Sequence, residues 1–328
     1  MRVALVGFGW WGQHIARRLI ANKDFELACV VEPMVSAHDA IRDLGLCPTS
    51  AFEDAFSYNI EGIILTSPNN QHDLQVEEAF DRGVHVFCEK PLSLSSKGAR
   101  ASVRKATEKN LVLGIGHERR FEPAIIALRQ LLKQGELGTI MHTEMAFSHN
   151  KLIGLGADSW RTSKAMAPAA GMTQMGIHLT DLLISFFGKV KTVAAFVADR
   201  SLGWETGDVV AVQLEFEKGM TAQLQAILHT PHFLRTHVFG TDMWVEIRNA
   251  THPDTPGGKV TMECFKSIDS TNIKQFEWTD SVTANLVSWA NACKGKEDYP
   301  YTHFELVHNI EVLEAIVKSA DEKTLVKL

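Results

Sequence analysis

Short apolar runs alternate with helical stretches over the first 120 residues of this chain. The runs occupy 2–6, 26–31, 61–65, 84–88 and 111–115. Short, continuous apolar runs are typical of strands that are buried on both faces of a parallel sheet. The pattern therefore predicts an α/β domain with a doubly wound parallel sheet.

The pattern changes after Pro123. A helix at 123–135, a strand at 140–148 and a helix at 172–187 come first. Polar and apolar residues then alternate, which predicts antiparallel strands at 190–198, 208–216, 220–228, 235–240 and 243–248. A long turn at 249–259 and helices at 280–293 and 303–320 complete the chain. We expect a domain over 1–120 and an α+β domain over 121–328, with a large, mostly antiparallel open sheet and a C-terminal helix that packs back on the first domain.

Composition narrows the function classes. The formal charge of -6 and the absence of a long basic run argue against nucleic-acid binding. No apolar stretch is long enough to span a bilayer, and a strand that starts at residue 2 leaves no room for a signal peptide, so we expect a cytoplasmic protein without membrane association. The five cysteines are scattered and form no CxxC pair, which predicts neither disulfides nor structural zinc, and we expect no metal.

Glycines follow the first strand at once. Gly7 allows a tight turn, Gly9 lets the backbone approach a phosphate, and Gly12 lets the next helix pack closely on its strand. This spacing favours a Rossmann domain that holds the pyrophosphate of a dinucleotide at the start of the helix. Phe8, Trp10 and Trp11 share the turn and belong to the predicted cofactor site.

Glu32 ends the second strand, twenty residues after the last motif glycine. An acid at this place accepts hydrogen bonds from the adenosine ribose and repels a 2′-phosphate. No arginine follows Glu32 immediately, so NAD is favoured over NADP. Arg42 is the nearest candidate partner for a 2′-phosphate.

Further motifs give the chain a family resemblance. They are ILTSPNNQH at 64–72, CEKP at 88–91, GHERRF at 116–121, the pair Trp160 and Arg161, and GMTQMGIHLTDLL at 171–183. Their order and spacing closely resemble the glucose-fructose oxidoreductase, inositol dehydrogenase and MocA family over residues 1 to about 190. The resemblance implies an oxidoreductase in which a hydride moves between a carbinol carbon and C4 of a nicotinamide.

The resemblance also implies roles for individual residues. Lys90 would stabilise the developing alkoxide and His178 would take the hydroxyl proton. In the alternative interpretation Lys90 is a strand-end lysine in an ion pair and His178 is a satisfied core histidine. Asp181 is expected to anchor local structure. The implied cofactor contacts comprise Ser67, Pro68, Asn69, His72, Glu89, Lys90, Arg119, Trp160 and Arg161.

Gln174 departs from the family pattern, because many relatives carry Asp four residues before the histidine. The familiar Lys, Asp and His trio is incomplete. The predicted substrate contacts comprise Lys90, His117, Arg119, Gln174 and His178. Many cationic or ionisable groups suggest a carboxylate on the substrate: Arg119, Arg120, Arg161, Lys164, His117 and a late cluster of His229, His232, Arg235 and His237.

We therefore expect an NAD-dependent dehydrogenase that acts on a secondary alcohol of a sugar, polyol or cyclic diol. A reductase of a ketone or imine, an NAD-retaining lyase, and a non-catalytic NAD-binding regulator remain as alternatives. An apolar uncovered face of the second sheet would favour a homodimer or homotetramer.

Overall fold

The chain divides into two compact units. The computed structural model describes residues 1–156 and 158–328. Within them, residues 1–117 and 282–310 form the first unit, and residues 118–281 and 311–328 form the second. The first unit thus ends three residues before the expected boundary, and the segment that returns to it contains most of one helix and the start of the next.

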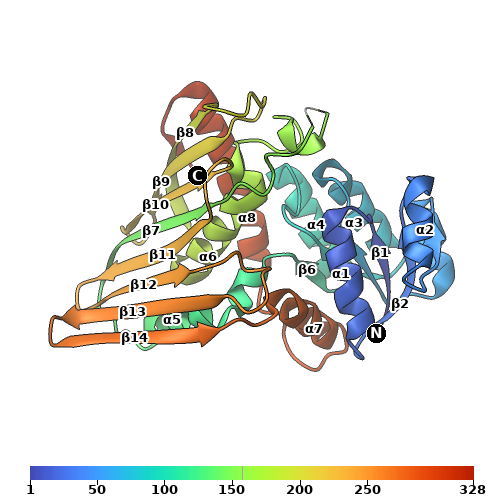
Figure 1. Ribbon diagram of the computed structural model, residues 1–328, viewed down its shortest axis with the longest axis horizontal. Coiled ribbons are helices and arrows are strands. Elements are labelled where there is room, and N and C mark those ends of the chain that lie inside the picture. Colours follow the sequence, from blue (N-terminus) through green and yellow to red (C-terminus); the bar gives the residue numbers. More distant parts are fainter. Residues whose placement is uncertain (157) are drawn as a thin grey trace. The chain divides into compact units, whose positions relative to one another are not determined.

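The first unit is built on a parallel sheet (Figure 1). Its described strands lie in the order β3-β2-β1-β4-β5-β6, and every neighbouring pair is parallel. The predicted doubly wound sheet is confirmed. Its strands are β1 (Arg2–Val6), β2 (Glu26–Val31), β3 (Pro48–Thr49), β4 (Gly62–Leu65), β5 (His85–Cys88) and β6 (Leu113–Ile115). Its helices are α1 (Trp10–Ala21), α2 (His38–Arg42), α3 (His72–Asp81), α4 (Ser96–Lys109), most of α7 (Ser281–Cys293) and the start of α8 (His303–Glu322).

Trp289 explains why α7 belongs to the first unit. Its indole is fully buried against the sheet and meets the Phe87 ring edge-on, with 5.7 Å between the ring centroids. A Cβ on Gly114 would collide with both rings. The glycine in β6 therefore makes room for an aromatic side chain from a distant part of the sequence.

The second unit carries a larger sheet, which is mostly antiparallel (Figure 1). Its described strands lie in the order β14-β13-β12-β11-β7-β10-β9-β8-β15, and only the pair β7 and β10 is parallel among those that the structure describes. Its first five strands in chain order are β7 (Ile140–Ser148), β8 (Val190–Ala198), β9 (Val209–Phe216), β10 (Thr221–Ile227) and β11 (Phe233–Gly240). The others are β12 (Trp244–Asn249), β13 (Lys259–Ser267), β14 (Ser270–Glu277) and β15 (Val326–Lys327).

The sheet buries one face more than the other. Along β11, Leu234, Thr236 and Val238 are buried, whereas Arg235 and His237 alternate with them and point to the opposite face. Helices α5 (Pro123–Lys133) and α6 (Ile177–Phe187) contact the sheet. The opposite face is the open face of this sheet.

Two regions differ from the prediction. Strands β13 and β14 follow the turn at 249–259 where no strand was expected, because β14 is almost wholly exposed and has no apolar alternation to reveal it. The helix expected at 172–187 begins instead as a π-helical turn at Met172–Gly176 and becomes α-helical only at Ile177.

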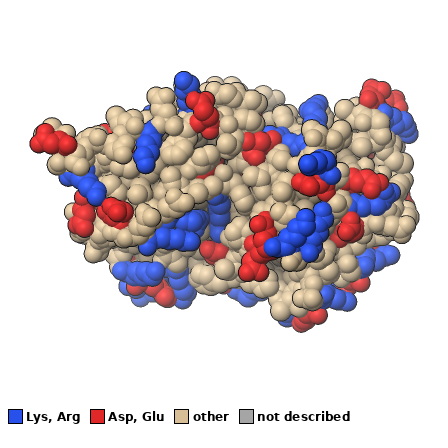
Figure 2. Space-filling model, turned by 90° about the horizontal axis from the view of Figure 1, so that it is seen from below, with Lys and Arg blue, Asp and Glu red and all other residues tan. Residues whose placement is uncertain are grey.

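The surface carries both signs of charge. Lysine and arginine side chains are interspersed with aspartate and glutamate on the face shown in Figure 2. No helix formed by residues 1–156 or 158–328 is long and apolar enough to cross a membrane.

Candidate cofactor and substrate site

The glycine turn after β1 is held tightly. Gly7 has a φ of 89°, which a residue with a side chain rarely adopts, and its amide donates to Val31 O at 2.8 Å. The Thr66 hydroxyl lies within hydrogen-bond distance of Val6 O and Gly7 O, at 2.8 and 2.9 Å. A Cβ on Gly12 would collide with the Gly7 carbonyl. Thr66 was missed in the sequence, although a hydroxyl residue at the end of the adjacent strand was a visible signal.

The start of α1 fits a phosphate. Gly9 is the N-cap residue, and no side chain from the described residues caps this end of the helix. A Cβ on Gly9 would meet no described atom within 4 Å, so the space beside the turn is open. Uncapped first-turn amides and the helix dipole together attract anions. These residues therefore fit the pyrophosphate of a dinucleotide.

Glu32 is fixed beside this turn. Its carboxylate accepts hydrogen bonds from the backbone amides of Phe8 at 2.8 Å and Met34 at 3.0 Å. Arg42, the alternative partner for a 2′-phosphate, forms an ion pair with Asp39 at 2.7 Å instead. A carboxylate held here can accept further hydrogen bonds from ribose hydroxyls, as the sequence predicted.

His72 braces two loops. The imidazole is fully buried, with Nδ1 2.7 Å from Pro91 O and Nε2 3.1 Å from Ser67 O. Burial lowers the pKa of His72. Both ring nitrogens face backbone carbonyls, and the expected direct contact with the cofactor stays a prediction. His72 ties the Ser67 to Asn69 loop to the segment after Lys90.

Glu89 and Lys90 lie where β5 ends. Glu89 is buried, which raises its pKa, and its Oε2 accepts from the Lys90 amide at 3.2 Å. A Cβ on Gly116 would collide with the Glu89 carboxylate, so the two segments are closely packed. The peptide between Lys90 and Pro91 is cis. Contacts of the residues before and after Lys90 therefore hold its backbone in place.

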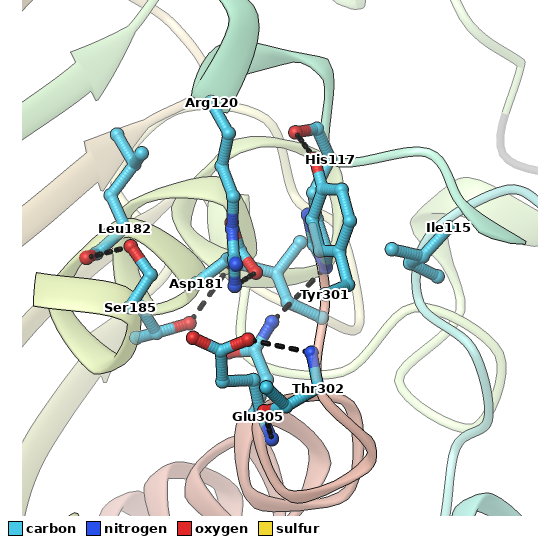
Figure 3. A network of polar contacts seen from close by, with 12 residues as sticks. Ile115, His117, Arg120, Asp181, Leu182, Ser185, Tyr301, Thr302 and Glu305 are labelled. Carbon is cyan, nitrogen blue, oxygen red and sulfur yellow. Dashed lines mark hydrogen bonds and ion pairs between the residues drawn. The ribbon is translucent and has the colours of Figure 1, made fainter. Parts of the chain in front are cut away.

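His117 is tied to α8 within the first unit (Figure 3). Its carbonyl accepts from the Tyr301 hydroxyl at 2.6 Å, and its Nε2 lies 3.1 Å from Asn309 Nδ2. Because an amide nitrogen only donates, His117 Nε2 is the acceptor in this contact. The predicted contact of His117 with the substrate stays a prediction.

In the second unit, Arg120 and Asp181 form a bidentate ion pair (Figure 3). The distances are 2.8 Å from Nε to Oδ2 and 2.6 Å from Nη2 to Oδ1, and both side chains are buried. The pair connects the short 3-10 turn Glu118–Phe121 to α6. The expected anchoring role of Asp181 is confirmed.

His178 lies near the start of α6, directly after the π-helical turn. Its ring is buried, with Nδ1 3.9 Å from Glu118 Oε2 and its centroid 6.4 Å from that of Phe147. Gln174 donates from Nε2 to Arg161 O at 3.0 Å and so ties the turn to the segment Trp160–Thr162. Gln174 lies within the π-helical turn and His178 in α6, so the two do not have the regular α-helical spacing that a helix over 172–187 predicts.

Of two arginines that were predicted to contact the cofactor, Arg119 is buried within its own unit and Arg161 is partly buried. Arg119 is 1% exposed and pairs with Glu122 through Nε at 2.8 Å, while its guanidinium lies 5.6 Å from the Phe147 ring centroid. Arg161 stacks on the Trp160 ring at 4.2 Å, and burial lowers its pKa. The predicted contacts of Arg119, Trp160 and Arg161 with the cofactor stay predictions.

The late histidine and arginine cluster does not converge. His229 lies 2.9 Å from the Ser201 hydroxyl. Arg235 forms an ion pair with Glu144 on the open face, and His237 Nδ1 lies 3.6 Å from the Glu246 carboxylate on that face. His232 lies just before β11 and contacts the backbone of β12. The cluster therefore gives no common carboxylate site.

A second histidine group was missed in the sequence. The rings of His149 and His252 lie 5.1 Å apart, and both contact the Phe147 ring. Asp254 accepts from His252 Nδ1 at 2.6 Å and from Lys151 Nζ at 2.7 Å. Burial is the main cause that lowers the pKa of His149 to about 3. These residues come from the end of β7, the segment directly after it and the turn at 249–259, and their separation in sequence concealed them.

No metal centre accompanies this group. Among residues 1–156 and 158–328, no three His, Cys, Asp or Glu side chains are placed to hold a metal ion.

The glycine turn, the acid after β2 and the polar groups at the strand ends define a dinucleotide-binding α/β protein. Residues 1–117 match the model of an oxidoreductase family with an NAD-binding Rossmann fold, and residues 125–246 match the C-terminal domain of GFO/IDH/MocA proteins. The chain belongs to the Gfo/Idh/MocA family of NAD(P)-dependent oxidoreductases.

Individual relatives agree with this assignment. An NAD(+) scyllo-inositol 2-dehydrogenase of Bacillus subtilis is 25% identical over 77% of this chain and 75% of its own length. An NADP(+) scyllo-inositol 2-dehydrogenase of the same species is 24% identical over 82% of this chain and 79% of its own. The crystal structure of an aldose-aldose oxidoreductase from Caulobacter crescentus has a TM-score of 0.87 at 21% identity, and covers 100% of this chain and 99% of that one.

The two motif glycines should separate folding from cofactor binding. Gly12→Ala should destabilise the first unit by about 1–3 kcal/mol, because its Cβ collides with the Gly7 carbonyl. Gly9→Ala should leave the melting temperature unchanged and still weaken NADH binding about tenfold or more, because its Cβ occupies only the space for the phosphate. Thermal melting and fluorescence titration with NADH measure the two effects. Equal NADH affinity in Gly9→Ala and the wild type would contradict this placement of the pyrophosphate.

The Arg120 and Asp181 pair should be structural. Asp181→Asn keeps the side-chain shape and removes the carboxylate that pairs with the buried Arg120, at a cost of about 3–5 kcal/mol. The double variant Arg120→Met, Asp181→Leu should recover most of the loss. Urea denaturation measures both, and a single variant as stable as the wild type would refute the anchoring role.

Proposed function

We propose that this protein is an NAD-dependent dehydrogenase that oxidises a secondary alcohol of a sugar, polyol or cyclic diol. The open, uncapped glycine turn beside the fixed Glu32 carboxylate is the observation that carries the proposal. Inositol dehydrogenases that resemble this chain over about three quarters of their length support the substrate class. The nicotinamide supplies the hydride acceptor at C4.

Lys90 and His178 manage the hydroxyl proton in this proposal. Lys90 lies just after β5, next to the buried Glu89, and its ammonium hydrogen-bonds the reacting oxygen as charge develops there. His178, a buried imidazole with Glu118 near its Nδ1, takes the proton. Gln174 positions the π-helical turn through Arg161 and carries no charge of its own.

The carboxylate-bearing substrate expected from the sequence has lost its basis. It rested partly on His229, His232, Arg235 and His237, which make separate contacts. It rested also on earlier cationic side chains, of which Arg119, Arg120 and Lys164 each pair with a carboxylate. We propose a neutral substrate instead. The cytoplasmic location stays a prediction.

We also propose that the protein associates with a second copy of itself through the open face of the large sheet. Aromatic rings of Trp244 and Phe265 stack there at 5.0 Å, and Phe196 is 73% exposed. Arg235 lies beside Glu144 and Glu246, so the face carries both signs of charge and can pair with its own copy about a two-fold axis.

Catalysis tests the main proposal. Wild-type protein should reduce NAD+ with at least one member of a panel of inositols, aldoses and their polyols. Lys90→Met and His178→Asn should each lower kcat by about 10²–10⁴-fold while NADH still binds. Lys97→Met, an exposed lysine on α4, serves as the control and should retain full activity. Wild-type turnover in both site variants would refute the proposal, and product formed without net NADH would indicate the lyase instead.

Cofactor preference tests Glu32. The wild type should use NAD+ with a KM about tenfold or more below that for NADP+, because the carboxylate repels a 2′-phosphate. Glu32→Gln should narrow this preference. Glu26→Gln, at the other end of β2, should leave it unchanged. A wild type that prefers NADP+ would overturn the assignment.

Light scattering after size-exclusion chromatography tests the association. Wild-type protein should elute at a multiple of the chain mass, and Phe196→Lys should shift it toward the monomer. A wild-type monomer at micromolar concentration would refute the interface.

A further inference from the structure

Several buried polar atoms in the second unit lack a hydrogen-bond partner among the described residues, and three of them belong to neighbouring side chains. These three are Arg119 Nη1, Asn249 Oδ1 and His232 Nδ1. Arg119 is 1% exposed and Asn249 is 7% exposed. Leaving such groups unpaired is energetically costly, so a native protein normally supplies a water or a ligand to them.

The three side chains belong to one connected cluster. Arg119 Nη2 and Asn249 Nδ2 both donate to the same oxygen, Glu122 Oε2, at 3.3 and 3.2 Å. The ring of His232 lies beside this pair, with Nε2 3.2 Å from Asn249 O. All of these residues lie in the second unit.

The existing contacts fix the chemistry of each unpaired atom. An ionised Glu122 only accepts, so Asn249 must turn its NH2 group toward Glu122 and present Oδ1 elsewhere. The Asn249 carbonyl also only accepts, so the proton of His232 is on Nε2. Burial lowers the pKa of His232, which favours the neutral ring with an unprotonated Nδ1. The cluster therefore offers one donor, on Arg119, and two acceptors.

A hydroxyl group matches this set, whereas a carboxylate does not. A hydroxyl accepts from a guanidinium and donates to an amide oxygen or an imidazole nitrogen, but an ionised carboxylate has no proton for the two acceptors. Charge leads to the same conclusion. Arg119 is paired with the Glu122 carboxylate, and nearby Lys151 is paired with Asp254. The positive charges of this cluster are therefore already neutralised and do not favour an anionic ligand.

The cluster lies near the predicted proton acceptor within the same unit. The Phe147 ring contacts the Arg119 guanidinium at 5.6 Å and the His178 ring at 6.4 Å. His232 is only partly buried and gives the cluster an edge toward solvent. We infer that Arg119, Asn249 and His232 form a hydroxyl-binding subsite that recognises a part of the substrate away from the reacting carbon. This inference rests on the proposed dehydrogenase function and names residues that determine its specificity.

Variants at His232 test the subsite, because this side chain carries an acceptor and a structural donor on different atoms. His232→Gln keeps a donor near the position of Nε2 and loses the acceptor at Nδ1, whereas His232→Asn keeps an acceptor near Nδ1. With the neutral polyol that the wild type oxidises best, His232→Gln should raise KM about tenfold with little change in kcat. His232→Asn should restore part of the loss. His229→Gln, which alters only the contact with Ser201, is the matched control.

Substrate analogues provide the decisive measurement. Each monodeoxy analogue of that polyol is tested against the wild type and His232→Gln. One analogue should lose about tenfold in kcat/KM with the wild type and lose little more with the variant, because the variant has already removed the same hydrogen bond. Glucuronate and glucuronamide form the charge test, and the neutral amide should bind at least as well as the acid.

The outcomes separate the subsite from the function. In one outcome the wild type oxidises polyols, but the loss in kcat/KM of every deoxy analogue adds fully to the loss caused by His232→Gln. The proposed subsite is then wrong and the unpaired atoms bind only water, while the proposed dehydrogenase function is retained. A marked preference for glucuronate over glucuronamide would also overturn the subsite. If no polyol is oxidised, the proposed function fails, and the subsite is then judged by thermal shifts of NADH-bound protein with scyllo-inositol and D-xylose, where no shift refutes it.

Discussion

A buried charge must find its counter-charge inside the protein, and the second unit depends on this constraint. Two adjacent arginines begin it and satisfy the constraint in different directions. Arg120 forms an ion pair with Asp181 on α6, whereas Arg119 forms one with Glu122, directly after the turn that carries both arginines. The first pair fixes the turn to the helix that carries His178. The second pair holds the Arg119 guanidinium beside Phe147. Its Nη1 has no partner among the described residues and is the one donor that the cluster offers to a ligand.

Backbone polar groups play the corresponding part in the first unit. Its strand ends carry loops whose carbonyls would be unsatisfied if they moved apart, and Thr66 and His72 hold them together. Both side chains support the loops at the strand ends, and this support requires no contact with the cofactor. Thr66 fixes the carbonyl that lies against Gly12, and His72 joins the loop after β4 to the loop after β5. The residues expected to do chemistry thus depend on neighbours that do none.

The sequence predicted the parts of the structure that local pattern controls. Continuous apolar runs gave the parallel strands, alternation gave the meander, and the glycine spacing gave the turn, because each of these signals lies within a few residues. Strand β14 was not predicted because its exposed residues show no alternation. The group of His252 and Asp254 was not predicted for another reason. They meet His149 across about a hundred residues of chain, and only the sheet pairing brings them together. The false cluster failed because Arg235 and His237 share the open face with two glutamates, whereas His229 and His232 lie before β11 and make separate contacts.

The π-helical turn before α6 has an evolutionary consequence. A π-helical turn contains one residue more than an α-helical turn, so it corresponds to a single-residue insertion accommodated without breaking the helix. Residues on its two sides therefore keep their order in an alignment while their side chains rotate relative to each other. Gln174 can share an aligned column with an aspartate in a relative that has a regular helix there and still point in another direction. Loss of one residue from this turn would rotate Gln174 relative to His178 without a substitution at either position.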